Sequence, residues 1–151
     1  MLNHNQTRTR FKFIVPNICY IKGVQKIHGF SRGWHHRNSI RLGINRSENE
    51  QPRFHAYTYI KGKQVTFTLG NLPVGGEYYC ELWLTKHNIG AEIRDVNDNI
   101  VFSVDHKHKK PIRLCRFGYD LGQYFEIDGT NTESQMIDLD GNEIDVEVWG
   151  V

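Results

Sequence analysis

The chain has 151 residues, of which 38 % are hydrophobic and 24 % are charged. This balance predicts one globular domain over residues 1–151 that buries its own core, with residues 1–9 as an N-terminal arm. No apolar run reaches the roughly 18 residues of a membrane span. The net charge of +2 argues against nucleic acid as a partner.

Period-two alternation of apolar and polar residues dominates the chain, and no segment shows helical periodicity. The alternating segments end at Gly, Asn and Asp, which favour turns. In chain order the predicted strands are 10–15, 17–22, 38–44, 53–60, 64–69, 77–85, 91–96, 100–105, 112–117, 123–128, 134–139 and 143–149. A spacing of roughly 8 to 12 residues between strands predicts an all-β fold, an antiparallel jelly-roll β-sandwich with little or no helix.

Turn chemistry places several hairpins between these strands. Lys61-Gly62-Lys63 predicts a tight turn, because glycine adopts a positive φ at little cost. The residues 96–99 form an Asn- and Asp-rich turn, and Asp128-Gly129 and Asp140-Gly141 are strong hairpin signals. The segment 70–77 is expected to be a loop, since it contains a proline and adjacent glycines.

The predicted strand 77–85 carries aromatic residues on both faces. One face has Tyr78, Cys80, Leu82 and Leu84, and the other has Tyr79, Glu81, Trp83 and Thr85. The second face is amphipathic, so it is expected to form a contact surface outside the core. Aromatic side chains of this kind can stack on sugars, and the candidates in the whole chain are Trp34, Tyr57, Tyr59, Tyr79 and Trp83.

A series of short motifs runs through the middle of the chain. They are the stretch His36-Arg37-Asn38-Ser39-Ile40-Arg41, then Tyr57 and Tyr59, then the hairpin Gly62-Lys63. Together they resemble the concanavalin-like and laminin-G-like jelly-roll superfamily, in particular its small bacterial and phage members. Where such members carry Tyr-Phe-Gly-Gly, this chain has Tyr124-Phe125-Glu126-Ile127. The resemblance implies the fold and leaves the function open, since this fold hosts lectins, glucanases, lyases and structural modules.

Three acids alternate in the segment from Glu143 to Glu147, which is similar to the Glu-x-Asp-x-Glu signature of laminarinase- and lichenase-type glycosidases. The resemblance implies Glu143 as nucleophile, Asp145 as its assistant and Glu147 as acid/base, in a retaining mechanism. That family carries the signature near the middle of its domain, whereas only residues 148–151 follow it here. The intervening Ile144 and Val146 also suit an ordinary half-buried strand. We therefore expect no catalytic activity, with a glycoside hydrolase as an alternative.

Metal ligands are sparse in the sequence. The turns 95–99 and 138–142 offer oxygen ligands for Ca²⁺, but neither continues as an EF-hand. The pairs His35/His36 and His106/His108 suit a transition metal, yet lysines surround the second pair. No metal or cofactor is expected, and Ca²⁺ is the alternative. The three cysteines have no CxxC spacing and are expected to be reduced and mostly buried: Cys19, Cys80 and Cys115.

The N-terminal third is basic and the C-terminal quarter is acidic, an arrangement that suits contacts with a protein partner or with further copies of the chain. The N-terminus lacks the apolar core of a signal peptide, which predicts synthesis in the cytoplasm. We expect a lectin-like binding or assembly module, a capsid-decorating or tail-associated accessory protein of a bacteriophage particle. A carbohydrate-binding module that uses the aromatic residues named above is the alternative.

Overall fold

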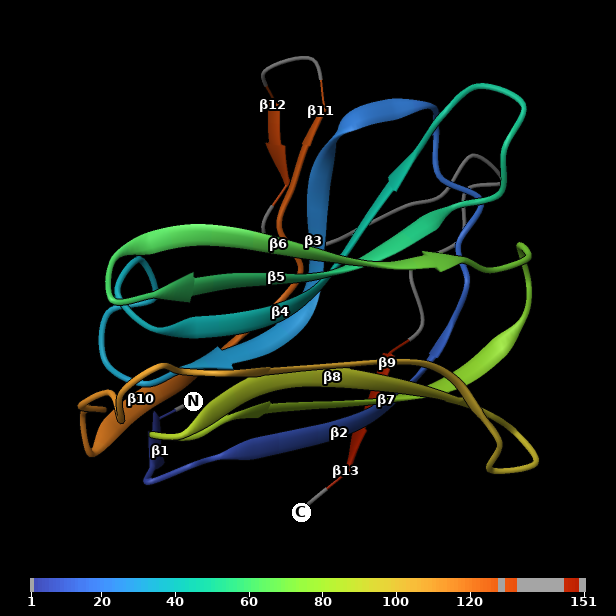
Figure 1. Cartoon of the computed structure of the whole chain (residues 1–151). Coiled ribbons are helices and arrows are strands. Elements are labelled where there is room, and N and C mark those ends of the chain that lie inside the picture. The colour runs from blue at the N-terminus through green and yellow to red at the C-terminus, as the bar shows by residue number, and fades with distance from the viewer. Residues whose placement is uncertain (1, 128–129, 133–145, 150–151) are drawn as a thin grey trace.

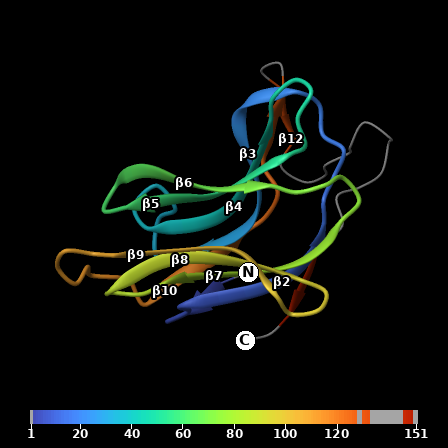
Figure 2. The ribbon, with the colours of Figure 1, turned by 45° about the vertical axis from the view of Figure 1, so that its right-hand side comes forward.

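Two antiparallel sheets face each other in the computed structural model, which describes residues 2–127, 130–132 and 146–149 (Figures 1 and 2). One sheet has the strand order β1 (Leu2–His4), β10 (Phe117–Leu121), β3 (Ile21–Ser31), β4 (Ser39–Arg46), β5 (Arg53–Ile60) and β6 (Lys63–Asn71). The other has the order β13 (Val146–Trp149), β2 (Arg8–Ile14), β7 (Glu77–Leu84), β8 (Asn88–Asp95) and β9 (Ile100–Lys107). A separate ribbon pairs β11 (Phe125–Ile127) with β12 (Thr130–Thr132).

The chain crosses between the two sheets after β1, after β2, after β6 and after β9. Consecutive strands β3 to β6 form a meander in one sheet, and β7 to β9 form a meander in the other. These crossings confirm the predicted antiparallel jelly-roll β-sandwich. None of the described residues lies in a helix, so no helix among them is long and apolar enough to cross a membrane.

The core lies between the inner faces of the two sheets. Alternate residues of β2, β4, β5, β7 and β8 point inward and are buried; the largest are Phe11, Phe13, Leu42, Phe54 and Leu82. Phe13 of β2 packs on Phe54 of β5, with ring centroids 5.2 Å apart, and so joins the two sheets directly. Burying each such side chain contributes about 1.5–3 kcal/mol, which makes this contact layer the main source of stability.

Turn chemistry placed two of the described hairpins correctly, β5–β6 and β8–β9. Lys61 (φ 51°) and Gly62 (φ 82°) form a two-residue loop between β5 and β6, the type I′ geometry that matches strand twist. Asp98 also has a positive φ of 66° in the predicted turn between β8 and β9. The Asp128-Gly129 and Asp140-Gly141 turns lie outside the described residues.

Strand β3 is the main departure from the predicted strands. The sequence indicated a strand at 17–22, whereas β3 spans Ile21–Ser31 and is the longest strand described. Its register against β4 shifts twice, between Ile21 and Gln25 and between Lys26 and His28. Each β-bulge interrupts the period-two pattern, and the sequence signal is lost with it.

The strand predicted at 112–117 is also wrong. Ile112 is buried and Leu114 packs against the core, so the alternation did identify inward-facing residues. The segment has no ladder partner, however, and β10 begins only at Phe117. The strand predicted at 134–139 lies outside the described residues, as does the first part of the strand predicted at 143–149.

The cysteines differ in their exposure, and all three are free thiols. Cys80 is buried, and burial raises the pKa of its thiol well above the ordinary value. Cys19 is half-buried, but Cys115 is exposed, so the expectation of buried cysteines is wrong for that residue.

Strands β3 and β4 approach each other closely at Gly29. A Cβ at this position would lie 1.9 Å from the carbonyl oxygen of Ile40 and 2.6 Å from Cα of Arg41, and both atoms belong to the backbone of β4. Since a strand backbone cannot move away cheaply, Gly29→Ala is expected to lower the free energy of unfolding by about 3 kcal/mol in a urea titration.

Gly23→Ala is the matched control in the same strand, because a Cβ there meets only the Gln25 side chain, at 3.7 Å. It is expected to change the free energy of unfolding by less than about 1 kcal/mol. Equal effects of the two substitutions would contradict the close approach of β3 to β4.

Candidate functional site

The outer face of the six-stranded sheet carries a cluster of aromatic and basic side chains. On β4 the inward residues Ile40 and Leu42 are fully buried, so Arg41 between them points outward. In the β4–β5 register Arg41 lies opposite Tyr57, while Tyr59 lies opposite Ser39. Strand alternation therefore places an arginine and two tyrosines side by side on one exterior surface.

The loop between β3 and β4 adds Trp34, His35 and His36 to this face. Buried Asn38 holds the loop: its side-chain oxygen accepts a hydrogen bond of 3.0 Å from the backbone N–H of Lys61. Its carbonyl accepts another of 3.0 Å from the N–H of Arg32. The β3–β4 loop is thereby tied to the β5–β6 hairpin, which carries it toward the end of β5.

Rings from the loop and from β5 form a continuous row. The ring centroids of Trp34 and His36 lie 4.9 Å apart, those of His36 and Tyr59 lie 5.1 Å apart, and those of Tyr59 and Tyr57 lie 6.0 Å apart. Edge-to-face and tilted contacts at these distances hold the rings in defined orientations. Trp34 is 65 % exposed, so the row ends in a freely accessible indole.

Tyr119 of β10 fixes the inner end of the loop. Its hydroxyl accepts a hydrogen bond of 3.1 Å from the backbone N–H of His35. The same hydroxyl lies 2.8 Å from the imidazole Nδ1 of His35. Burial lowers the pKa of His35, and the nearby His36 and Arg41 lower it further. The neutral imidazole is therefore favoured, and its ring is held against the tyrosine.

These side chains surround a hollow of about 580 Å³, a volume typical of small-molecule sites. Its lining includes Lys26, His35, Arg41, Tyr57, Tyr119 and Tyr124. The segment that follows β10 closes one side, because the backbones of Lys26 and Tyr124 exchange two hydrogen bonds of 3.0 and 2.9 Å. The hollow thus combines aromatic walls with several hydrogen-bond donors.

Two cations lie among the tyrosines of this hollow. Lys26 Nζ is 4.4 Å from the ring centroid of Tyr57 and 5.5 Å from that of Tyr124, within cation–π range. Burial lowers the pKa of Arg41. Burial, together with a hydrogen bond that the Tyr57 hydroxyl donates to Tyr59, raises the pKa of Tyr57 to about 12, so its hydroxyl stays protonated. Among the described lining residues, Asp120 is the single carboxylate.

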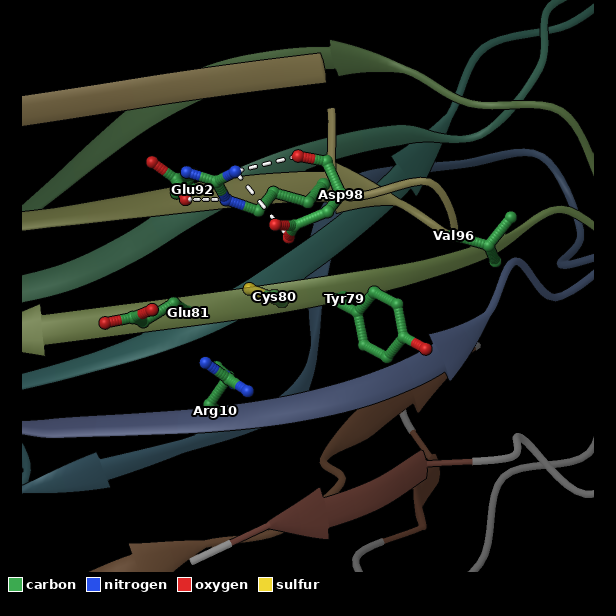
Figure 3. Close-up of a pocket in the computed structure, with 8 residues that line it drawn as sticks. Arg10, Tyr79, Cys80, Glu81, Glu92, Val96 and Asp98 are labelled. Carbon is green, nitrogen blue, oxygen red and sulfur yellow. Dashed lines mark hydrogen bonds and ion pairs between the residues drawn. The ribbon is translucent and has the colours of Figure 1, made fainter. Parts of the chain in front are cut away.

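The outer face of the five-stranded sheet has a different character (Figure 3). Its hollow, of about 590 Å³, is lined by charged side chains of β2, β7 and β8 that pair with one another. Arg94 lies 2.5 Å from a carboxylate oxygen of Glu92 and 3.6 Å from one of Asp98, as the dashed lines in Figure 3 mark. Arg8 pairs with Glu81 in the same way. These charges satisfy each other and form an ordinary solvated surface.

Trp83 and Tyr79 belong to this charged face. The Trp83 indole lies against Gly90, where an added Cβ would meet ring carbons at 2.6 and 2.7 Å. Its Nε1 donates a hydrogen bond of 2.7 Å to Asp105, and the Arg8 guanidinium lies 5.9 Å from the ring centroid. The indole is already engaged by its own sheet, which makes it a poor platform for a ligand.

The structure therefore divides the five predicted stacking residues between two opposite faces. Trp34, Tyr57 and Tyr59 share the six-stranded sheet with the hollow, whereas Tyr79 and Trp83 lie on the other sheet. The sequence pattern did not indicate a site at four residues of the hollow: Lys26, Arg41, Tyr119 and Tyr124. The β4–β5 register could have indicated Arg41, but the bulged β3 and the displaced β10 hid the others.

The acidic segment at the C-terminal end is described only in part. Glu143 and Asp145 lie outside the described residues. Glu147 lies in β13, where its backbone pairs with Lys12 of β2 at the edge of the five-stranded sheet. The structure therefore leaves the glycosidase alternative untested.

The predicted calcium and metal positions show ordinary local structure where they are described. The carboxylate of Asp95 accepts backbone hydrogen bonds of 2.9 Å from both Asn97 and Asn99, which lowers its pKa and forms the turn. The turn at 138–142 lies outside the described residues. Among those that are described, no group of three His, Cys, Asp or Glu side chains could hold a metal ion.

Comparisons with known proteins give little beyond this geometry. No protein-family model matches the chain, and no curated protein matches it. The crystal structure of Xenopus laevis galectin-Ib is similar over 99 % of this chain and 98 % of that chain, with 10 % sequence identity and a TM-score of 0.44. A likeness at this level carries no conclusion about a ligand, which has to come from the side chains themselves.

His55, on the same outer face, makes the stability of the sheet depend on pH. The side-chain nitrogen of Asn45 donates to the Lys22 carbonyl, so the side-chain oxygen of Asn45 faces the imidazole of His55. This oxygen accepts a hydrogen bond of 2.7 Å from Nε2 of His55. The other ring nitrogen, Nδ1 of His55, then accepts a hydrogen bond of 3.1 Å from the Thr68 hydroxyl. Burial, and then the charge of Arg53, lower the pKa of His55 to about 4. This pKa is below the ordinary 6.5 of the unfolded chain, so the unfolded state binds more protons between these values.

The free energy of unfolding is therefore expected to fall as the pH drops from 6.5 to 4, by an amount approaching about 3 kcal/mol for this one group. Urea titrations across this range, for the native chain and for His55→Gln, measure the effect. The variant should show a shallower slope. An NMR titration midpoint of the His55 ring near 6.5 would contradict the prediction.

Proposed function

We propose that this protein is a lectin-like, non-catalytic carbohydrate-binding module whose site is the hollow on the outer face of the six-stranded sheet. The observation that carries the proposal is the row of rings from Trp34 through His36 and Tyr59 to Tyr57, beside a hollow lined with donors. A sugar has an apolar C–H face and a rim of hydroxyls. It needs both an aromatic surface and nearby polar groups.

The geometry of the hollow supports a preformed site. The loop that carries Trp34 and His36 is held by Asn38, and the tyrosines stand on adjacent strands of a paired sheet. Side chains held in this way lose little conformational freedom when a ligand binds, which favours affinity for a flexible and strongly hydrated molecule. The charged face of the other sheet lacks this combination, because Arg8 and Arg94 already pair with carboxylates there.

A matched pair of substitutions distinguishes the two faces. Tyr59→Ala removes a ring from the row and is expected to weaken glycan binding about tenfold or more, as measured by isothermal titration with ligands selected from a glycan array. Tyr79→Ala removes the same side chain from the five-stranded sheet and should leave the affinity unchanged. Loss of binding in Tyr79→Ala alone would move the site to the other face.

The proposal of a non-catalytic protein has its own test. Incubation with β-1,3 and mixed-linkage glucans is expected to release no reducing sugar, because we assign no catalytic role to Glu143, Asp145 or Glu147. Hydrolysis that disappears in Glu143→Gln would overturn this assignment and establish the glycosidase alternative.

The expectation of a bacteriophage accessory protein rests on sequence features alone and stays a prediction. A carbohydrate-binding module and a particle component are compatible roles, since a module of this kind can bind a cell-surface glycan from within an assembly. The hollow supports the carbohydrate-binding role only.

A further inference from the structure

We propose that the hollow selects acidic sugars, and that Arg41 binds their anionic group, either a sulfate ester or a carboxylate. This inference rests on the proposed function and names the class of carbohydrate. It follows from the charges that surround the hollow, which are distributed differently from those elsewhere on the molecule.

Arg41 has no carboxylate partner among the residues that the structure describes. Elsewhere in the described chain, four basic side chains form ion pairs with acids: Arg8, Lys12, Arg53 and Arg94. No such pair joins Arg41 to any described carboxylate, although Arg41 is only partly exposed and burial lowers its pKa. A cation that has lost part of its hydration without gaining an anion is in an unfavourable environment, which a bound oxyanion would relieve.

The neighbours of Arg41 leave its guanidinium accessible to a ligand. The residue opposite on β3 is Gly29, which has no side chain to cover it. The groups that interact with it electrostatically are the hydroxyls of four tyrosines that line the hollow or its rim: Tyr57, Tyr59, Tyr119 and Tyr124. Neutral phenols can donate hydrogen bonds to an oxyanion, and the planar guanidinium can bind two of its oxygens at once.

Lys26 supplies a second positive charge on the same side. Its ammonium group lies over the rings of Tyr57 and Tyr124. The single carboxylate among the described lining residues is that of exposed Asp120. Two cations against one anion give the hollow a positive field, which favours a negatively charged ligand over a neutral one.

The row of aromatic rings favours an anionic group that is part of a sugar over a free anion. Arg41 and Tyr57 are paired in the sheet, and Tyr59 follows two residues further along β5, roughly 7 Å away along the strand. Beyond it the row continues to His36 and Trp34. An acidic group on Arg41 would therefore place the rest of an oligosaccharide along aromatic surfaces that lead to the β3–β4 loop.

The experiment compares oligosaccharides that differ only in their acidic groups, by isothermal titration of the full chain. One arm uses carrageenan oligosaccharides, which are sulfated galactans without carboxylates, and their desulfated form; the other uses oligogalacturonate and its full methyl ester. In at least one arm, the acidic form is expected to bind about tenfold more tightly than its neutral counterpart. Its affinity is expected to fall as salt is added. The arm that shows the preference identifies sulfate or carboxylate as the preferred group.

Variants then test the assignment to Arg41. Arg41→Gln should bring the ratio of acidic to neutral affinity close to one, and Arg41→Lys should lose most of it, because lysine cannot form the two-pronged contact. Urea titrations verify that both variants fold. Lys110→Gln, in the exposed basic segment after β9, is the matched control and should keep the native ratio.

The two proposals fail in different ways. Equal affinity for acidic and neutral sugars, or a preference that depends on Lys110 instead of Arg41, would overturn the acidic-sugar inference and leave carbohydrate binding intact. Absence of binding to any glycan, acidic or neutral, on the array would overturn the proposed function itself.

Discussion

The structure depends on one constraint, the alternation of side chains across pleated strands whose inner faces must be buried. Phe11 and Phe13 of β2 and Phe54 of β5 close the space between the sheets, and their burial sets the register of the strands that carry them. Once those residues point inward, their neighbours have to point outward. Arg41 and Tyr57 are on the exterior because Leu42 and Ala56 are in the core.

The two outer faces that this constraint creates have become chemically different. On the five-stranded sheet the charges alternate in sign and pair across strands, as Arg8 does with Glu81, so they stabilise the surface and leave little for a ligand. The hollow on the six-stranded sheet is lined mainly by aromatic rings, and the ammonium group of Lys26 lies over two of them, those of Tyr57 and Tyr124. A face of paired charges offers a ligand little to bind, whereas aromatic rings beside cations suit the ligand that we propose.

Prediction from sequence worked where local chemistry decides the outcome. The β5–β6 turn followed from Gly62, and the two faces of β7 followed from strict alternation, with Cys80 and Leu82 buried as expected. Prediction from sequence failed where residues distant in the chain determine the local structure. The bulges of β3 have no signal in the residues around them. The alternation around Ile112 correctly indicated a buried residue, but the segment forms no strand.

The sequence by itself determined the class of fold, the β5–β6 and β8–β9 turns and the side of each regular strand, because pleating and turn geometry act over a few residues. Only the tertiary structure decided which aromatic residues share a surface. Trp34 and Tyr59 are far apart in the chain and meet through His36, while Trp83 lies on the opposite sheet. That outcome depends on strand order and on the Asn38 tie between two loops. Both are long-range pairings that no local periodicity encodes.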